Sequence, residues 1–254
     1  MNHTTLAQPR WLAPFHTGHA AVQRRILLCF PYGGGGMAPF LGLNALNSID
    51  IAAWGVRLPG REERIQEAPA LSVEQMINAI VTELQALTLP FAFYGHSFGA
   101  GLALDIAHAL AERGHPLPTH LLLSGRMPPH TGYSSLLGAM NDQQLWAHIR
   151  AQSTLPLPPD PACSFARTAV KKLKADLALN QQLTYRFLRP LPVPLHTLNG
   201  YDDPLIDPHR LDEWGCYTSA TFQSQCVPGG HFFFEDDFPR FYSFFLTALS
   251  EQGS

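Results

Sequence analysis

The chain lacks the features that mark membrane proteins, exported proteins and nucleic-acid-binding proteins. No apolar run is long enough to cross a bilayer, and residues 1–8 are polar, without the apolar core of a signal peptide. The formal net charge is only −3, from 17 Lys and Arg against 20 Asp and Glu, so no basic surface for nucleic acid is indicated. We expect a cytoplasmic protein with neither a membrane nor a nucleic acid as partner, and we expect it to be a monomer.

Cysteine is also scarce, which argues against a disulfide framework and against a zinc site. The chain has four cysteines that stand far apart, at Cys29, Cys163, Cys216 and Cys226. Their separations match none of the spacings of structural metal sites. We expect all four to be reduced thiols, and we expect the protein to need no metal and no redox cofactor.

What the chain does contain is an alternation of short apolar segments with helical patterns. The predicted strands in the first half are Arg24–Phe30, Ile51–Val56, Leu89–Tyr94 and Thr119–Ser124. Between them, Met37–Leu46 and Ala100–Leu110 have helical composition, and Ser72 is a suitable cap for a helix that runs to Leu87. Strands that alternate with helices predict βαβ units and therefore a mostly parallel sheet flanked by helices.

This alternation is interrupted after Gly125. Residues 126 to about 190 show helical patterns and no clear strand, whereas strands resume at Val193–Asn199 and Thr221–Val227. A helix is expected to begin near Pro208, and a closing helix is predicted from about Glu235 to Leu249. The 254 residues therefore predict one α/β domain over 1–254, with a helical insertion at about 126–190. Such insertions often lie over the strand ends as lids.

The most informative stretch is the G-x-S-x-G run from Gly95 to Gly99. It follows a predicted strand and precedes a predicted helix, which is the context of a nucleophile elbow. The serine, Ser97, would occupy a strained turn, and the two glycines would let the strand and helix nearly touch. This context predicts an α/β-hydrolase fold with Ser97 as the nucleophile.

A serine nucleophile needs a base, and in this fold the order along the chain is serine, acid, histidine. His231 follows the last predicted strand in a glycine-rich loop and is the favoured base. His209 also lies downstream, but at an expected helix start, and His96 is expected to point away from Ser97 at the turn.

The acid should follow the strand that precedes this histidine. Asp203, in the turn after Asn199, is favoured over its neighbour Asp202, and Asp207 remains a third candidate. The other position that this fold allows for the acid, after the strand Thr119–Ser124, holds no carboxylate. That absence favours Asp203.

Acyl transfer also needs hydrogen-bond donors for the oxyanion of the tetrahedral intermediate. The backbone N–H of Phe98, directly after the nucleophile, is one expected donor. The second is expected from the glycine-rich loop after the first strand, where Gly33 is favoured and Tyr32 is the alternative. This loop lacks the Lys-Ser/Thr of a P-loop, and no dinucleotide-binding fingerprint is evident, so a phosphate site is not indicated.

Six motifs in this order resemble the type II thioesterases that accompany non-ribosomal peptide and polyketide synthases. The motifs are Leu27–Gly35, Leu58–Glu62, Gly95–Ala100, Ser124–Arg126, Asp202–Pro204 and Gly229–Phe233. The resemblance covers about residues 10–250, and a close relative of the family is the free-standing thioesterase of animal fatty acid synthesis. This resemblance implies an α/β-hydrolase fold with a helical lid.

The resemblance also implies roles for individual residues. It places the nucleophile on Ser97, the acid on Asp203, the base on His231 and the oxyanion donors on Gly33 and Phe98. The implied activity is editing, in which unwanted acyl groups are hydrolysed from the phosphopantetheine arm of acyl or peptidyl carrier proteins. The chain departs from the family in one place, because Tyr-Gly stands at positions 32 and 33 where the family usually has His-Ala.

Three other functions are compatible with the same residues. A medium-chain fatty acyl thioesterase and a general carboxylesterase would use the same triad, whereas a catalytically silent acyl-binding module would not need all three residues.

A basic cluster in the insertion is one candidate docking face for an acidic carrier protein. It consists of Arg167, Lys171, Lys172 and Lys174, of which 167, 171 and 174 would share one face of a helix.

Overall fold

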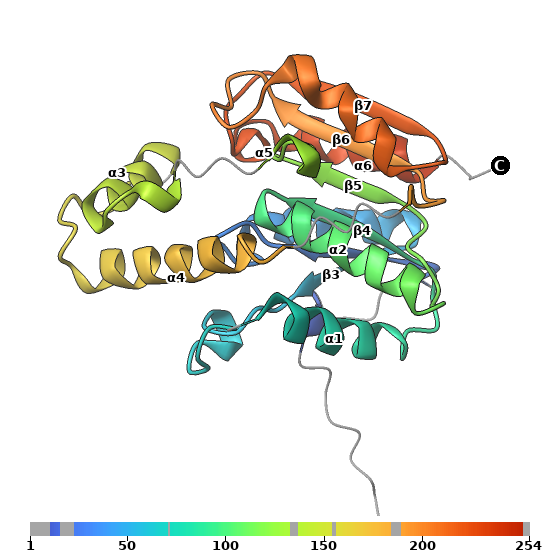
Figure 1. The fold of residues 1–254 in the computed structure, drawn as a ribbon, viewed down its shortest axis with the longest axis horizontal. Helices are drawn as coiled ribbons and strands as arrows, with labels where there is room; N and C mark the ends of the chain where they lie inside the picture. The colour runs from blue at the N-terminus through green and yellow to red at the C-terminus, as the bar shows by residue number, and fades with distance from the viewer. Residues whose placement is uncertain are drawn as a thin grey trace, which may run out of the picture.

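The fold is a mostly parallel β-sheet covered by helices on both faces (Figure 1). The computed structural model describes residues 11–15, 23–70, 72–132, 137–153, 156–183 and 189–250. Within these ranges the strands form one seven-stranded sheet in the order β1-β3-β2-β4-β5-β6-β7. They are β1 (Leu12–Pro14), β2 (Arg25–Phe30), β3 (Ile51–Val56), β4 (Phe91–His96), β5 (Leu121–Ser124), β6 (Leu195–Gly200) and β7 (Phe222–Val227). Only the edge strand β1 runs antiparallel to its neighbour; the other pairs are parallel.

Side chains of the central strands point alternately to the two faces of the sheet and belong to two separate hydrophobic cores. Leu28 and Phe30 of β2 belong to the core on one face of the sheet, and Leu27 and Cys29 belong to the core on the other. The first face is covered by α1 (Val73–Leu84), α2 (Phe98–Glu112) and the 3₁₀ segment η5 (Pro208–Tyr217). The second is covered by the 3₁₀ segment η1 (Ala38–Ile49), α5 (Phe233–Asp236) and α6 (Phe238–Ser250).

The segment between β5 and β6 forms a helical extension with a small core of its own. The described residues of this segment form two short 3₁₀ turns, η3 (Pro129–Thr131) and η4 (Leu137–Ala139), and two helices, α3 (Asp142–Gln152) and α4 (Ser164–Asn180). Leu145 and Trp146 of α3 pack with Val170 and Leu173 of α4 in this core. Figure 1 shows the two helices lying together and projecting from one end of the sheet.

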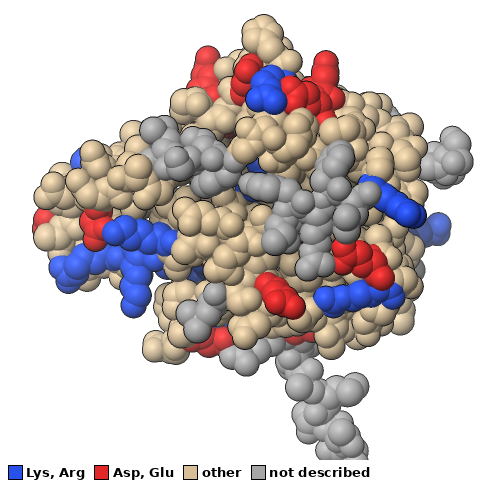
Figure 2. All heavy atoms as spheres, in the orientation of Figure 1, with Lys and Arg blue, Asp and Glu red and all other residues tan. Residues whose placement is uncertain are grey.

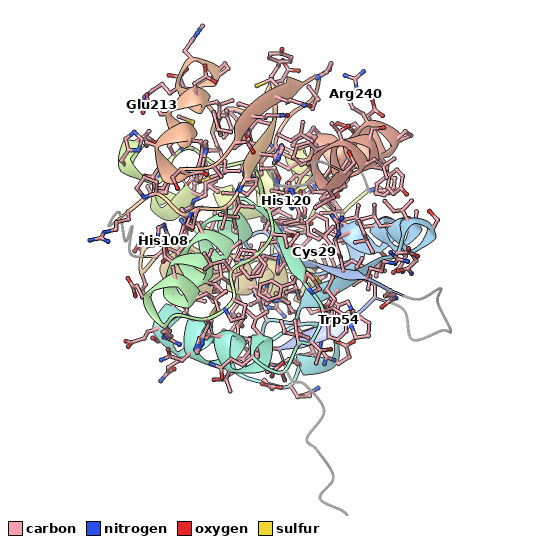
Figure 3. The ribbon with its side chains drawn as sticks, turned by 90° about the vertical axis from the view of Figure 1, so that its right-hand side faces the viewer. Cys29, Trp54, His108, His120, Glu213 and Arg240 are labelled. Atoms are coloured by element: carbon pink, nitrogen blue, oxygen red, sulfur yellow. The ribbon has the colours of Figure 1, made fainter. Side chains whose placement is uncertain are left out.

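The state of the cysteines and the length of the helices can be compared with what the sequence predicts. All four cysteines lie in the described part of the chain and are free thiols. Cys29 is completely buried in the sheet (Figure 3), where burial raises the pKa of its thiol. None of the helices in the described ranges combines the length and hydrophobicity that a bilayer crossing requires.

The predicted order of elements is confirmed, with local differences at the boundaries. The strand at Ile51–Val56 and the helix capped by Ser72 are found as expected, and Ser72 Oγ accepts a hydrogen bond from Gln75 N at 3.4 Å. The prediction missed β1, which is too short to show alternation. It was wrong in making the closing helix continuous, because the chain leaves helical geometry at Asp237, with φ −137° and ψ 71°, between α5 and α6. Residues 184–188, part of the helical stretch predicted in the insertion, lie outside the described residues.

Candidate active site

Ser97 occupies a strained turn between β4 and α2. Its backbone angles, φ 55° and ψ −113°, are unusual for a residue that carries a side chain. A Cβ atom on Gly95 would lie 2.3 Å from the Gly99 carbonyl oxygen, and one on Gly99 would lie 2.2 Å from the Phe30 carbonyl oxygen. Both positions therefore require glycine, because the strand, the helix and the neighbouring strand approach one another so closely. This is the nucleophile-elbow geometry that the sequence predicts.

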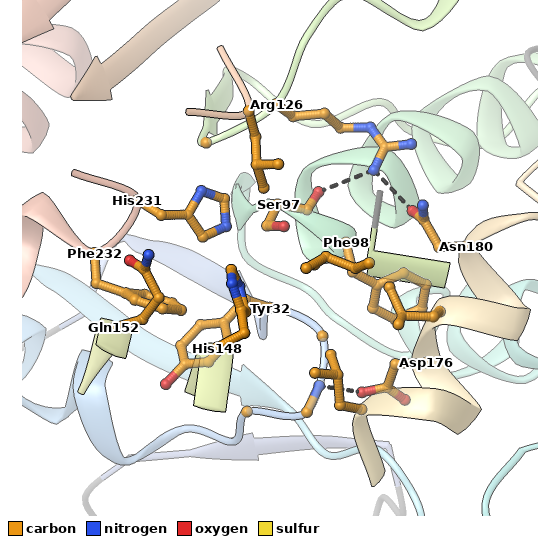
Figure 4. Close-up of a pocket in the computed structure, with 18 of the residues that line it drawn as sticks. Tyr32, Ser97, Phe98, Arg126, His148, Gln152, Asp176, Asn180, His231 and Phe232 are labelled. Carbon is orange, nitrogen blue, oxygen red and sulfur yellow. Dashed lines mark hydrogen bonds between the residues drawn. The ribbon is translucent and has the colours of Figure 1, made fainter. Parts of the chain in front are cut away.

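A buried acid–base pair stands at the same end of the sheet. The Asp203 carboxylate oxygen Oδ2 lies 2.6 Å from His231 Nδ1, and the residues are only 3% and 7% exposed. The second carboxylate oxygen of Asp203 accepts the backbone N–H of Leu205 at 2.9 Å, which fixes the orientation of the carboxylate. With Nδ1 donating to Asp203, the other ring nitrogen of His231 is left to act as a base. Figure 4 shows the imidazole ring facing the Ser97 hydroxyl.

The loops that carry this pair are held together by backbone contacts at the ends of β6 and β7. Asp202 N donates to the Gly229 carbonyl oxygen at 2.9 Å. At the end of β6, a Cβ atom on Gly200 would lie 2.3 Å from the carbonyl oxygens of both Gly229 and Gly230. The absence of a side chain at Gly200 therefore lets the two loops meet, which brings Asp203 to His231.

The alternative acids and the alternative base make other contacts or are exposed. Asp202 is exposed, and its backbone rather than its side chain takes part in the loop contact. Asp207 is exposed and caps η5, where its carboxylate accepts the backbone N–H of His209 at 3.0 Å. His209 itself is exposed at the start of that segment. Of these candidates, only Asp203 and His231 are brought together.

His96, the residue before the nucleophile, is completely buried behind the acid–base pair. Its Nδ1 lies 2.8 Å from Ser124 Oγ, which in turn lies 2.9 Å from the Tyr94 hydroxyl. The ring centroids of His96 and His231 are 4.7 Å apart. Burial, and then the charge of His231, hold the pKa of His96 well below its usual range, so this ring stays neutral. His96 therefore supports the His231 ring by packing and does not compete with it as a base.

The glycine-rich loop after β2 brings the two predicted oxyanion donors close together. A Cβ atom on Gly33 would lie 3.8 Å from Phe98 Cβ, so the peptides of these residues are neighbours. Both residues line the same pocket as Ser97 and His231. The adjacent Tyr32 turns its ring onto an aromatic cluster, with its centroid 4.7 Å from that of Phe232. Burial, and then the charge of Glu235, raise the pKa of the Tyr32 hydroxyl, so it remains protonated.

A cavity of about 760 Å³ opens over Ser97 beneath the helical extension. Much of its wall consists of apolar side chains from the extension, namely Leu137, Ile149, Leu157, Phe165, Leu173 and Leu177. A space of this size and character suits an acyl chain attached to the carbonyl that Ser97 would attack.

The pocket also contains polar residues that the sequence analysis did not assign. His148 of α3 lines the cavity (Figure 4). Burial, and then the charge of His231, lower the pKa of His148, whereas the nearby Asp203 carboxylate acts in the opposite direction. The spacing of His148 from Gln152, which lines the same cavity, is the only local signal in the sequence, since residues four apart share a helix face.

We call the glycine-rich loop after β2 (residues 31–37) the oxyanion loop, after its proposed role. Two of its glycines are expected to respond differently to alanine. Gly33→Ala should keep the activity and raise stability by about 0.4–1 kcal/mol, because the new Cβ would meet no atom closer than 3.6 Å. Gly34→Ala should lower both, because Gly34 has φ +77° and its Cβ would lie 3.2 Å from Leu173 Cβ. Thermal melts and kcat/KM for a thioester substrate test this pair. Equal losses in the two variants would contradict the described course of the loop.

The sheet, the strained serine turn and the acid–base pair define a serine hydrolase of the α/β-hydrolase class. Residues 25–249 match the family model described as "Thioesterase domain", and the chain belongs to that thioesterase family. The protein is therefore a thioester hydrolase, as the resemblance implied.

Individual relatives agree with this assignment. The chain is 28% identical over 226 residues to "Gramicidin S biosynthesis protein GrsT" of Aneurinibacillus migulanus, with 88% of each chain covered. It is 29% identical over 217 residues to "S-acyl fatty acid synthase thioesterase, medium chain" of Homo sapiens, with 83% of this chain and 81% of the relative covered. Among solved structures, the RedJ thioesterase of the prodiginine biosynthetic pathway in Streptomyces coelicolor superposes with a TM-score of 0.82 at 29% identity. That match covers 91% of this chain and 95% of RedJ.

Proposed function

We propose that this protein is a type II thioesterase that removes aberrant or stalled acyl groups from the phosphopantetheine arm of carrier proteins in a non-ribosomal peptide or polyketide synthase. The observation that carries the catalytic part is the 2.6 Å contact of Asp203 with His231 beside Ser97 at the floor of the cavity. The carrier-bound substrate is supported by relatives such as GrsT and RedJ, whose names place them in gramicidin S and prodiginine biosynthesis.

In the proposed reaction, Ser97 Oγ attacks the thioester carbonyl carbon while His231 takes the hydroxyl proton. Asp203 holds the imidazole in the required tautomer. The N–H groups of Phe98 and Gly33 stabilise the oxyanion that forms on the carbonyl oxygen. His231 then gives its proton to the leaving pantetheine thiol, which leaves the acyl group on Ser97.

The second half of the reaction uses the same groups. His231 takes a proton from a water molecule, which attacks the acyl-Ser97 ester and releases a carboxylic acid. The proton then returns to Ser97 Oγ. Each step uses side chains and peptides of a single chain, so the proposed reaction requires no second subunit, no metal and no redox cofactor. We propose that the enzyme acts as a monomer and that its location is cytoplasmic.

A medium-chain fatty acyl thioesterase is the second candidate. It is favoured by the similarity to the human medium-chain thioesterase and by the apolar side chains that the extension contributes to the cavity. It differs from the first proposal in the acyl group and the carrier, whereas the roles of Ser97, Asp203 and His231 are the same in both.

The two functions are separated by a matched set of substrates. The same short acyl, aminoacyl and medium-chain acyl groups would be presented on a carrier protein, on a pantetheine mimic and as oxyesters. We expect the highest kcat/KM for the carrier-bound thioesters, with short acyl and aminoacyl groups accepted. Exclusive use of medium-chain acyl groups would favour the second candidate, and preferential use of oxyesters would contradict both.

The basic face of α4 is the proposed contact for the carrier protein. Arg167, Lys171 and Lys174 are exposed on this helix, and Figure 2 shows a group of basic side chains over the α4 region. Lys174 also forms an ion pair with Asp142 at the start of α3. Lys172, by contrast, is half-buried and lines the cavity, so it does not share the exposed face.

Charge reversal on this face should weaken carrier binding selectively. The double variant Lys171→Glu/Lys174→Glu is expected to raise KM for the acyl-carrier substrate by roughly tenfold and to spare the pantetheine mimic, because only the carrier supplies acidic partners. The control variant is Arg24→Glu/Arg240→Glu, which makes the same charge change at exposed positions outside the helical extension. Equal effects on the carrier and the mimic would place carrier recognition elsewhere.

A further inference from the structure

The C-terminal half of α4 is bound directly to the oxyanion loop. Asp176 lies in this half and is only 2% exposed. Its Oδ2 accepts the backbone N–H of Gly34 at 2.6 Å, a bond that Figure 4 shows. The same carboxylate receives Arg61 Nη2 at 2.9 and 3.0 Å on its two oxygens. A residue of the helical extension thus contacts the peptide that follows the proposed donor Gly33.

Arg61, in the loop after β3, binds the oxyanion loop as well as Asp176. It is 5% exposed, and its Nη1 donates to the Gly35 carbonyl oxygen at 2.5 Å. The next residue, Glu62, accepts the backbone N–H of Met37 at 2.6 Å. Three backbone groups of the loop are therefore held by charged side chains. Such bonds are about twice as strong as neutral ones and are directional.

A second polar contact joins the same helix to the nucleophile turn. Asn180 lies one turn after Asp176, is 2% exposed, and accepts Arg126 Nη1 at 2.8 Å. The same Arg126 nitrogen donates to the Ser97 carbonyl oxygen at 3.2 Å (Figure 4). The end of α4 therefore bonds to the oxyanion loop directly, and to the nucleophile turn through Arg126.

The charges of the first contact also fit a role beside a developing oxyanion. A buried carboxylate close to the reacting carbonyl would by itself disfavour negative charge on that oxygen. Arg61 neutralises Asp176 through two hydrogen bonds of its guanidinium, so the loop is fixed without leaving a net negative charge. An apolar side chain at position 176 could cover the loop but could not orient the Gly34 peptide.

We propose that Asp176 is a positioning residue for the oxyanion hole. It fixes the position of the oxyanion loop through its hydrogen bonds with the Gly34 peptide and with Arg61. This inference rests on the proposed function, because it takes Ser97 as the nucleophile and Gly33 as an oxyanion donor. Its consequence is that the helical extension does more than cover the cavity, since it sets the geometry of the groups that stabilise the transition state.

The test compares Asp176→Asn with the matched control Glu67→Gln. Glu67 likewise binds a buried arginine, Arg64, at 3.0 and 2.7 Å, but none of these contacts reaches the oxyanion loop. For each variant we would measure kcat and KM on a pantetheine thioester, and the affinity for the carboxylic acid product. The affinity for an alkyl trifluoromethyl ketone, which forms a tetrahedral adduct with a nucleophilic serine, completes the set.

We expect Asp176→Asn to lower kcat and the affinity for the ketone in parallel, by about 100-fold, because a small displacement of the donors is costly in the transition state. KM and the product affinity should stay unchanged, since the acyl-chain pocket is intact. Glu67→Gln should leave all four quantities unchanged. If Asp176→Asn loses ketone affinity no more than product affinity, the positioning role is overturned.

A second variant covers the case in which Asp176→Asn does not fold, because a buried Arg61 without its acid is destabilising. Arg61→Met/Asp176→Leu removes both charges and should restore the melting temperature while leaving kcat and ketone affinity low. Recovery of both in this folded double variant would also overturn the proposal. Failure of the proposed function itself would look different, since a wild-type protein that hydrolyses no thioester, or a fully active Ser97→Ala variant, would expose it.

Discussion

Replacing Ser97 with alanine is expected to lower kcat for thioester hydrolysis by several orders of magnitude. Removal of the nucleophilic serine from a serine protease lowers kcat by about 10⁶-fold, and we expect a similar loss here. The acyl group then has no oxygen to be transferred to, so only substrate binding and the oxyanion donors remain. The measurement is the turnover of an acyl-pantetheine thioester, with the melting temperature and product affinity as checks on folding.

Ser243→Ala is a suitable control for this experiment. Ser243 lies exposed on α6, where its hydroxyl donates to the Pro239 carbonyl oxygen at 3.0 Å, and it does not line the pocket. It should leave turnover unchanged. Substantial hydrolysis by a folded Ser97→Ala protein would remove Ser97 from the mechanism.

The second large effect is expected at the acid. Asp203→Asn should lower kcat by about 10⁴-fold, because an amide at this position favours the wrong tautomer of His231 and no longer stabilises the imidazolium. Asp202→Asn is the matched control, one residue away and exposed, and it should change kcat little. Turnover of the same thioester at a fixed pH checks both. A larger loss in Asp202→Asn would move the acid by one residue.

Much of the fold and the central part of the site could be predicted because their causes are local in the sequence. The strand, turn and helix around Ser97 are contiguous. Glycine is required at positions 95 and 99 because a Cβ atom there would lie only 2.3 and 2.2 Å from a backbone carbonyl oxygen. Asp203 and His231 each follow a strand. Parallel strands end at the same edge of a sheet, which brings the two residues within reach of Ser97.

The features that escaped prediction depend on contacts between distant parts of the chain. The Arg61–Asp176 pair joins residues 115 positions apart, and no periodicity connects a loop after β3 with a helix of the extension. The motif that contains Arg61 contributed to the family resemblance, but its role becomes visible only in the contact with Gly35. His148 was missed for a similar reason, because its position over the pocket follows from how α3 packs on α4.

Tyr32 shows how a local departure from the family can be understood from its surroundings. Its ring fills space among Phe40, Phe232 and Phe234, with a centroid distance of 4.7 Å to Phe232, so the side chain belongs to the aromatic support of the His231 loop. The backbone of the loop is held by Asp176, Arg61 and Glu62 instead. A change of side chain at position 32 is therefore compatible with the proposed donor role of the Gly33 backbone.

The role of Ser97 as the nucleophile of a thioester hydrolase is best tested by covalent labelling. The protein would be titrated with an alkyl fluorophosphonate, and intact mass, peptide mapping and hydrolysis of an acyl-carrier thioester would be followed together. We predict one phosphonyl group per chain, located on Ser97, with hydrolysis falling in proportion to labelling and reaching zero at one equivalent. Label on another residue, or hydrolysis that survives complete labelling of Ser97, would show that Ser97 is not the nucleophile.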